Sequence, residues 1–260
     1  MSNIKISIIT PTYNSEKTVE RTIQSVLNQD YPNLEYIIID GLSSDRTLSI
    51  VNKYRDKIAI IESGKDKNIS QAFNKGIAKA TGDVIGIINS DDFFLPGALQ
   101  KIADEFDGES DIYQGNILME DAETGFRCRE IPSKTFPKMP LLRHVAHQGM
   151  FVTREGYKKF GVYDEDIRWP MDLEFLMRAD RLGAKFHRIE YDMAVFVAGG
   201  FTSKSIIQKK DDYINIVLKN GGNRIQAYLY YLSLVGIQIT KKILNIVLPD
   251  FGQKLRYKKA

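Results

Sequence analysis

The feature that most constrains the fold is an alternation of short apolar runs with helical stretches between residues 6 and 88. The apolar runs predict four strands, over Ile6–Thr10, Tyr36–Ile39, Ile58–Ile61 and Val84–Ile88. The stretches between them predict helices over Thr18–Asn28, Asp45–Tyr54 and Ile69–Ala80. This order is typical of an α/β fold with a mostly parallel central sheet that helices cover on both faces.

The second half of the chain is less regular. The sequence predicts strands over Asp111–Glu120, Phe126–Ile131 and Met150–Thr153, helices over Arg154–Phe160 and Asp172–Leu182, and an extended segment over Lys185–Val197. We therefore expect a main domain over residues 1–204, with a ligand-binding half at about 1–115 and a second half at about 116–204. Residues 205–260 are expected to form a helical C-terminal appendage.

Composition excludes several classes of protein. The formal net charge of +3 is too small for nucleic acid to be the main partner. Cys128 is the only cysteine, so no internal disulfide can form and there is no thiolate cluster for zinc. The N-terminus enters a strand within a few residues and lacks the longer apolar core of a signal peptide, which predicts a cytoplasmic location.

The strongest functional signal is Ser90-Asp91-Asp92, at the end of the apolar run Val84–Ile88. Two adjacent carboxylates repel each other unless a cation or a hydrogen-bond donor lies between them. Open α/β sheets bind ligands at the carboxyl ends of their strands, so the pair predicts a divalent cation whose shell is completed by substrate phosphates. A solvated loop with an Asp helix cap is the alternative interpretation.

Two earlier strand ends also carry candidate ligand-binding groups. Tyr13, after the first strand, can stack against a planar group or simply pack in a strand-to-helix turn. Asp40 ends the second strand, at the same edge of the sheet as Asp91 and Asp92. Two acidic strand ends that converge are harder to explain as turn residues than one.

Four segments of the chain together resemble the inverting glycosyltransferases of family 2, which have the GT-A fold. They are ITPTYNSEKTVERTIQSVLNQ, IIIDGLSSDRT, NISQAFNKGIAKATGDVIGIINSDDFF, and HQGMFV with PMDLEFLMRADRLG. The resemblance implies transfer of a sugar from a nucleotide-diphosphate donor, with UDP favoured. The implied acceptor is a saccharide or a lipid-linked saccharide in cell-surface polysaccharide or lipopolysaccharide synthesis.

The resemblance also implies roles at the donor site. Pro11 and Tyr13 would line the base pocket with Asp40 nearby, Asp91 would lie near the ribose, and Asp92 would bind the Mn²⁺ or Mg²⁺ that bridges the diphosphate. Many relatives carry Asp-Asp where this chain has Asp40-Gly41, which leaves base selectivity open.

An inverting transfer also needs a base that takes the proton of the acceptor hydroxyl. The resemblance makes Asp172 the candidate, with Glu174 in reserve, whereas a helix cap is the alternative role of Asp172. His147 would border the donor sugar, although a solitary His is more often a structural hydrogen-bonding group. Phe73 stands where many relatives carry Arg, so Lys67 is a candidate donor-site cation, with a solvated lysine as the alternative.

The C-terminal stretch from Ile225 to Leu248 has helical periodicity. Its apolar positions are Leu232, Val235, Ile239, Ile243 and Ile246, and its polar ones are Gln238, Lys241, Lys242 and Asn245. It is too polar for a transmembrane span, and Lys254, Arg256, Lys258 and Lys259 follow it. It therefore predicts a helix lying on an anionic membrane, at the inner face of the cytoplasmic membrane; packing on the main domain or in a homodimer is the alternative.

Two other functions are alternatives to sugar transfer. A nucleotidyltransferase that makes sugar nucleotides would carry a Gly-rich, basic loop after the first strand, and PTYNSEK is neither. A catalytically silent, membrane-attached binding module would not require its acids, yet Asp40, Asp91, Asp92 and Asp172 are all present.

Overall fold

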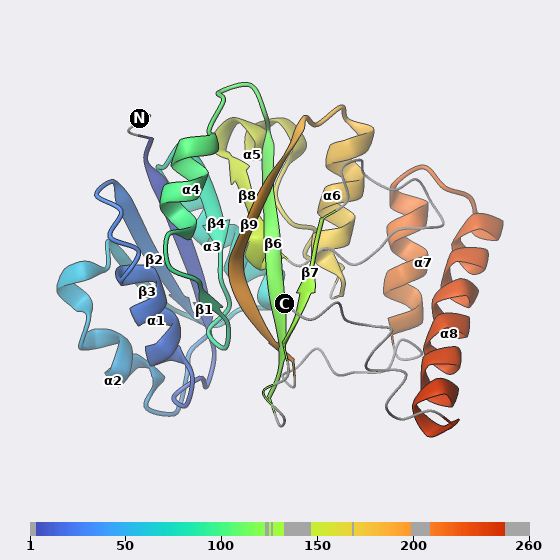
Figure 1. Cartoon of the computed structure of the whole chain (residues 1–260), viewed down its shortest axis with the longest axis horizontal. Coiled ribbons are helices and arrows are strands. Elements are labelled where there is room, and N and C mark those ends of the chain that lie inside the picture. The colour runs from blue at the N-terminus through green and yellow to red at the C-terminus, as the bar shows by residue number, and fades with distance from the viewer. Residues whose placement is uncertain are drawn as a thin grey trace.

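A computed structural model describes residues 4–122, 125, 127–132, 147–167, 169–198 and 209–247. The strands in these residues are β1 (Ile6–Thr12), β2 (Leu34–Asp40), β3 (Ile60–Ser63), β4 (Val84–Ile87), β5 (Phe93–Phe94), β6 (Ile112–Asp121), β7 (Arg127–Glu130), β8 (Met150–Thr153) and β9 (Phe186–Ala198). They form a single sheet in the order β3-β2-β1-β4-β8-β6-β9-β5, with β7 paired to β6 (Figure 1).

The helices are α1 (Val19–Leu27), α2 (Thr47–Asn52), α3 (Ile69–Lys79), α4 (Ala98–Glu105), α5 (Arg154–Phe160), α6 (Met171–Arg181), α7 (Lys210–Lys219) and α8 (Arg224–Val247). Short 3-10 helices lie at Arg55–Lys57 and His147–Gly149. Helix α4 and strand β5 were not predicted from the sequence. Residues Gly199 and Gly200 and the basic end from Lys254 to Lys259 lie outside the described residues.

The sheet is parallel where the sequence predicts it. Strand β1 pairs in parallel with β2 and β4, and β2 pairs in parallel with β3. Strand β8 then runs antiparallel to both β4 and β6, so the second half of the sheet is mixed. The α/β class is therefore confirmed, and the uninterrupted parallel part is the half that carries Asp40 and the Asp91-Asp92 pair.

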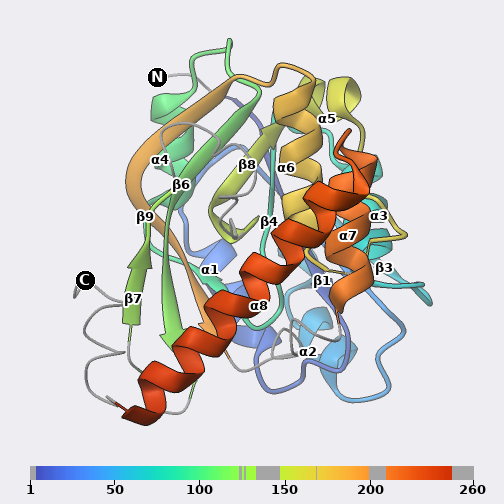
Figure 2. The same ribbon diagram turned by 90° about the vertical axis from the view of Figure 1, so that its right-hand side faces the viewer.

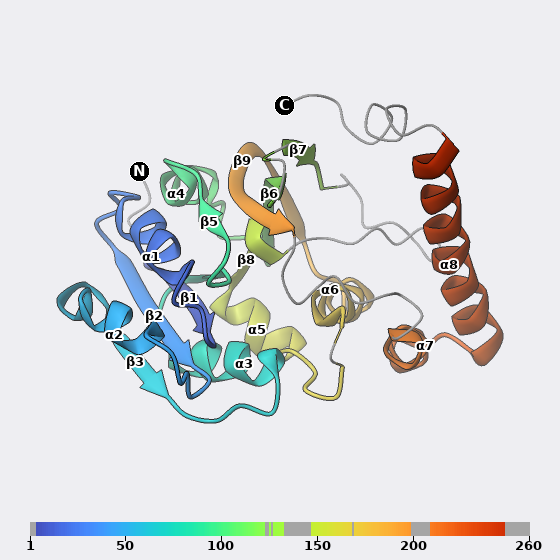
Figure 3. The ribbon, with the colours of Figure 1, turned by 90° about the horizontal axis from the view of Figure 1, so that it is seen from below.

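Alternate strand residues explain why helices cover both faces of this sheet. In β1, Ile6 and Ile8 point into a buried cluster with α1 and α4, whereas Ile9 points into a second cluster with α3 and α6. Successive side chains of a strand point to opposite faces, so a strand that is apolar at nearly every position is buried on both. Because β1, β2, β3 and β4 run in the same direction, they end at the same edge of the sheet, which Figure 3 shows from below.

The C-terminal helices pack on the main domain. Tyr213 and Ile216 of α7 and Ala227 and Tyr230 of α8 are buried in the same cluster as α3 and α6. Figure 2 shows α8 crossing the outer face of the molecule in front of α7. Among the described residues, no helix combines the length and the apolar character that crossing a membrane requires.

Candidate active site

Asp40 organises the loop that follows β2. It is fully buried and lies opposite Thr12, whose hydroxyl donates a hydrogen bond of 3.0 Å to its Oδ1. Its Oδ2 accepts hydrogen bonds from the backbone N–H of Ser43 at 3.0 Å and from the Ser63 hydroxyl at 2.7 Å. Because both carboxylate oxygens accept hydrogen bonds from the protein, Asp40 shapes the floor of the site.

Tyr13 lies beside Gly41, the residue after Asp40. Its side chain is 65% exposed, which leaves a ring face open for stacking. A Cβ added to Gly41 would lie 3.4 Å from Cδ2 of Tyr13 and 3.4 Å from Oδ2 of Asp66. The structure thus places a carboxylate, which sequence reasoning missed, beside the glycine that replaces an acid of many relatives. Pro11 is a buried residue of β1 opposite Ile39.

The two acids after β4 have different surroundings. Asp92 is fully buried; its Oδ1 accepts a hydrogen bond of 2.9 Å from the Val197 N–H, and its Oδ2 accepts one of 2.6 Å from Gln148 Nε2. Burial, together with the neighbouring Asp91 charge, raises the pKa of Asp92. Burial also raises the pKa of Asp91, against the opposing effects of its own backbone N–H, of His147 and of Arg21. The Arg21 guanidinium donates a hydrogen bond of 2.6 Å to the Asp91 carbonyl.

This pair fits a divalent cation that takes most of its ligands from a substrate. The described part of the chain contains no group of three or more His, Cys, Asp or Glu side chains placed to hold a metal ion. Burial raises the pKa of both carboxylates, and hard cations such as Mg²⁺ are often held by one or two carboxylates plus phosphate oxygens. Both oxygens of Asp92 accept N–H groups from the protein.

One dipeptide connects the two acidic regions of the site. Gln148 contacts Asp92, and its neighbour His147 places Nδ1 3.8 Å from Oδ2 of Asp172. His147 is buried against Phe73 in an edge-to-face arrangement, at a centroid distance of 5.2 Å, and its Nε2 has no hydrogen-bond partner among the described residues. The 3-10 helix His147–Gly149 therefore brings the base candidate and the metal candidates to the same site.

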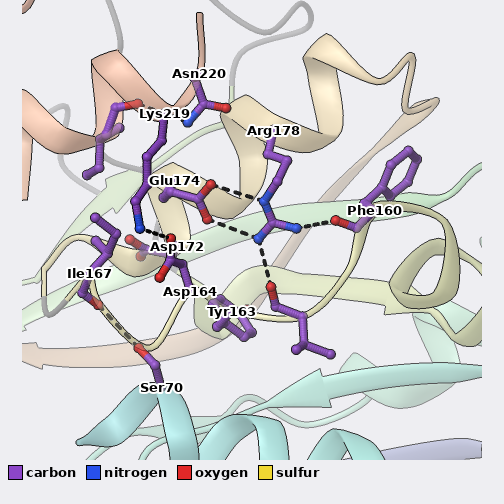
Figure 4. Close-up of polar contacts among 12 residues, drawn as sticks. Ser70, Phe160, Tyr163, Asp164, Ile167, Asp172, Glu174, Arg178, Lys219 and Asn220 are labelled. Atoms are coloured by element: carbon purple, nitrogen blue, oxygen red, sulfur yellow. Dashed lines mark hydrogen bonds and ion pairs between the residues drawn. The ribbon is translucent and has the colours of Figure 1, made fainter.

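Asp172 and Glu174 differ sharply in what they contact. Asp172 is buried next to His147, and its Oδ1 accepts a hydrogen bond of 2.8 Å from the Leu173 N–H. Glu174 is paired through both oxygens with Arg178, at 3.0 Å to Nε and 3.0 Å to Nη2 (Figure 4). Glu174 thus anchors an arginine, and Asp172 is the acid that faces the rest of the site.

Arg178 in turn holds the loop between α5 and α6. Its guanidinium donates hydrogen bonds to the carbonyls of Phe160 and Val162, the latter at 2.7 Å (Figure 4). Gly161, between them, has φ +80°, and a Cβ there would lie only 3.0 Å from Arg178 Nη1. Both the backbone conformation and the close guanidinium therefore require glycine.

The remaining predicted residues lie at the rim or in the core. Lys67 pairs with Asp166 at 3.0 Å, and both side chains are more than half exposed. Phe73 is fully buried between His147 and Tyr163, so an apolar ring fills the position where many relatives carry Arg. Arg21, missed in the sequence, is the cation that the structure places beside Asp91.

Sequence comparisons identify relatives of this chain. The family model described as glycosyl transferase family 2 matches residues 7–160, more than half of the chain. The poly(ribitol-phosphate) β-N-acetylglucosaminyltransferase TarS of Staphylococcus aureus is 28% identical over 229 residues, which are 81% of this chain and 39% of TarS. An uncharacterised glycosyltransferase of Methanocaldococcus jannaschii, MJ1057, is 28% identical over 87% of this chain and 77% of its own length. The chain thus spans about two fifths of the length of TarS.

Solved structures of glycosyltransferases share the fold. Residues 1–349 of S. aureus TarS in complex with UDP-GlcNAc superpose with a TM-score of 0.68 at 21% identity, over 89% of this chain and 72% of that one. The mannosyltransferase PcManGT of Pyrobaculum calidifontis, in complex with GDP-Man and Mn²⁺, gives a TM-score of 0.66 at 14% identity, over 95% and 81%. The predicted GT-A architecture is confirmed.

Proposed function

The chain belongs to glycosyl transferase family 2, and we propose that it transfers a sugar from a UDP-linked donor, with inversion, to a saccharide or lipid-linked saccharide of the cell surface. The observation that carries the proposal is the dipeptide His147-Gln148, which contacts Asp172 on one side and Asp92 on the other. A donor diphosphate and an acceptor hydroxyl bound at these two acids would meet within one site. The UDP-GlcNAc complex of the TarS structure supports a UDP-linked donor.

We assign the donor to the edge where β1, β2 and β4 end. The exposed Tyr13 ring would stack on the base, and the Asp66 carboxylate beside Gly41 would accept a hydrogen bond from it. Asp91 would hold a divalent cation, which when bound stabilises the negative charge of the leaving diphosphate. We place the cation on Asp91 in preference to Asp92, since Asp92 already accepts three N–H groups, from Asn89, Gln148 and Val197.

Asp172 would act as the base. Its carboxylate would take the proton of the acceptor hydroxyl while the oxygen attacks C1 of the sugar from the face opposite the diphosphate. His147, buried at 3.8 Å from Asp172, would orient that carboxylate and exclude water from it.

The test is a screen of UDP-sugars and GDP-sugars by thermal unfolding and by release of free nucleotide, each with and without Mn²⁺. A bound donor at about 100 times its Kd raises the free energy of unfolding by about 2.7 kcal/mol, which shifts the midpoint measurably. We expect stabilisation by UDP-sugars that requires the cation, together with slow UDP release. Stabilisation by nucleoside triphosphates with release of pyrophosphate would instead support the nucleotidyltransferase alternative.

A further inference from the structure

Helix α8 has an unusual distribution of apolar side chains. Its inner face packs on α7 through the buried residues Ala227, Tyr230 and Tyr231. Its opposite face carries a row of apolar side chains that are more than half exposed, and we call this row the outer stripe: Ile225, Leu229, Leu232, Ile239 and Ile243. Their spacing of three, four or seven residues places them on one side of a helix.

The outer stripe runs along nearly the whole of α8. Ile225 is 73% exposed at the start of the helix, and Ile243 is still 53% exposed five turns later, about 27 Å along the axis. Figure 1 shows the C-terminal half of α8 extending past the end of α7. Soluble monomers rarely expose a contiguous apolar surface of this extent without a binding partner.

The net charge of the sequence segment that contains the stripe indicates the chemistry of that partner. Residues 224–260 contain seven Lys and Arg and one Asp, a net charge of 7 − 1 = +6. The whole chain carries +3, so residues 1–223 carry 3 − 6 = −3. A second copy of this chain on the stripe would bring two segments of +6 together, whereas an anionic surface would attract each of them.

We propose that the outer stripe of α8 binds an anionic lipid membrane, with the helix lying in the plane of the interface. Apolar side chains on one face with cations nearby are the combination that binds the headgroup and acyl boundary. Since no described helix is long and apolar enough to cross a bilayer, α8 lies on the surface. This inference goes beyond the proposed transfer reaction and does not depend on it.

Sedimentation of the full chain with lipid vesicles tests the inference. Vesicles of phosphatidylcholine mixed with phosphatidylglycerol should bind the protein, vesicles of phosphatidylcholine alone should bind it weakly, and added salt should weaken the binding without abolishing it. The triple variant Leu232→Ser, Ile239→Ser, Ile243→Ser should lower the partition coefficient on the order of 100-fold, because three apolar side chains no longer enter the interface. Ile237→Ser, an exposed apolar position on another side of α8, is the matched control and should bind like the wild type.

Two further measurements keep the outcome clear. The thermal unfolding midpoint of each variant shows whether the fold is kept. The double variant Lys241→Gln, Lys242→Gln tests how much positive charge contributes to vesicle binding, independently of the outer stripe. Equal sedimentation of wild type and triple variant, or failure of the wild type to bind anionic vesicles, would overturn the inference. So would a dimer in light scattering that the triple variant dissociates, since the stripe would then cover a second copy. None of these measurements requires a sugar donor, so the proposed function stands or fails separately.

Discussion

At the scale of single residues, Asp91 and Asp92 are adjacent in sequence but differ in the groups that surround them. Asp92 is enclosed by Asn89, Gln148 and Val197, and Asp91 lies beside Arg21. We therefore expect Asp91→Asn to abolish the Mn²⁺-dependent part of UDP binding, because the cation loses its carboxylate. Asp92→Asn should retain that dependence, since an amide oxygen can still accept the Val197 N–H. Calorimetric titration of UDP with and without Mn²⁺ measures both.

Loss of the Mn²⁺ dependence in Asp92→Asn, with the dependence kept in Asp91→Asn, would instead support Asp92 as the metal ligand, as predicted from the sequence. The unfolding midpoints of both variants must be compared with wild type, because Asp92 also connects the loop after β4 to β9 through the Val197 N–H. Loss of UDP binding counts as a metal effect only in a variant whose midpoint is unchanged.

A second prediction at this scale concerns Asp172. Asp172→Asn should bind UDP-sugar as wild type does but lose transfer, because an amide cannot take the proton of the acceptor hydroxyl. General bases typically contribute about 10²–10⁴-fold to the rate, so the loss should be of that order. Asp180→Asn, an exposed acid of the same helix, is the control and should keep full activity. Turnover of Asp172→Asn near the wild-type rate would remove Asp172 as the base.

At the scale of elements, α6 and the loop before it are held by the pair of Glu174 and Arg178. Glu174 is 2% exposed, so removing Arg178 leaves a buried carboxylate without its cation. We expect Arg178→Met to lower the free energy of unfolding by about 3–5 kcal/mol, the usual cost of breaking a buried ion pair from one side. Urea unfolding measures the change.

The surface pair Glu155–Lys158 of α5 is the matched control. Both side chains are more than half exposed, and Lys158→Met should change the free energy of unfolding by less than about 1 kcal/mol. The double variant Glu174→Gln, Arg178→Met should recover part of the loss, because no charge is then left buried. A single variant Arg178→Met as stable as wild type would show that the loop does not depend on this pair.

The loop between α5 and α6 also connects α6 to the ligand-binding half of the main domain. Asn74 of α3 donates a hydrogen bond of 2.9 Å to the Tyr163 carbonyl and accepts one of 3.0 Å from the Tyr163 N–H. Asn68, at the start of α3, donates one of 2.7 Å to the Glu165 carbonyl. The position of Asp172 relative to the donor site therefore depends on contacts between segments about 90 residues apart in sequence.

At the scale of the whole molecule, Glu35 makes folding stability depend on pH. Its carboxylate joins the starts of β1, β2 and β4 by accepting hydrogen bonds from Lys5, Ser7 and Thr81, at 2.6–2.7 Å. Burial alone would raise the pKa of Glu35, but these hydrogen bonds outweigh it and lower the pKa to about 2. A lowered pKa in the folded state stabilises the fold above the ordinary value of 4.5, and this stabilisation is lost as the pH falls towards 2.

We expect Glu35→Gln to lower the free energy of unfolding by about 2–3 kcal/mol at neutral pH and to flatten its fall below about pH 4.5. Urea unfolding as a function of pH measures both effects. Glu109→Gln, at an exposed loop position, is the control and should leave the pH profile unchanged. A wild-type slope in Glu35→Gln would show that other carboxylates cause the acid sensitivity.

The sequence by itself determined the order of the elements and which strand ends carry acids. A strand that is apolar at nearly every position, such as Ile6–Thr12, can only be buried on both faces, so alternation with helices is enough to predict the parallel half of the sheet. The position of Asp91 follows from the same local pattern. Strand β5 escaped prediction because its two residues carry no periodicity, and helix α4 was also not predicted.

Only the tertiary structure decided which donors each of these acids contacts. Asp40, Asp92 and Glu174 look like Asp91 and Asp172 in sequence, and their oxygens accept hydrogen bonds from Ser63, Val197 and Arg178 respectively. Ser63 and Val197 lie on strands distant in sequence, and no local pattern records them, whereas the spacing of four residues between Glu174 and Arg178 is a local helical pattern. The energy of a carboxylate depends on every donor and charge within a few ångströms, and folding sets that environment.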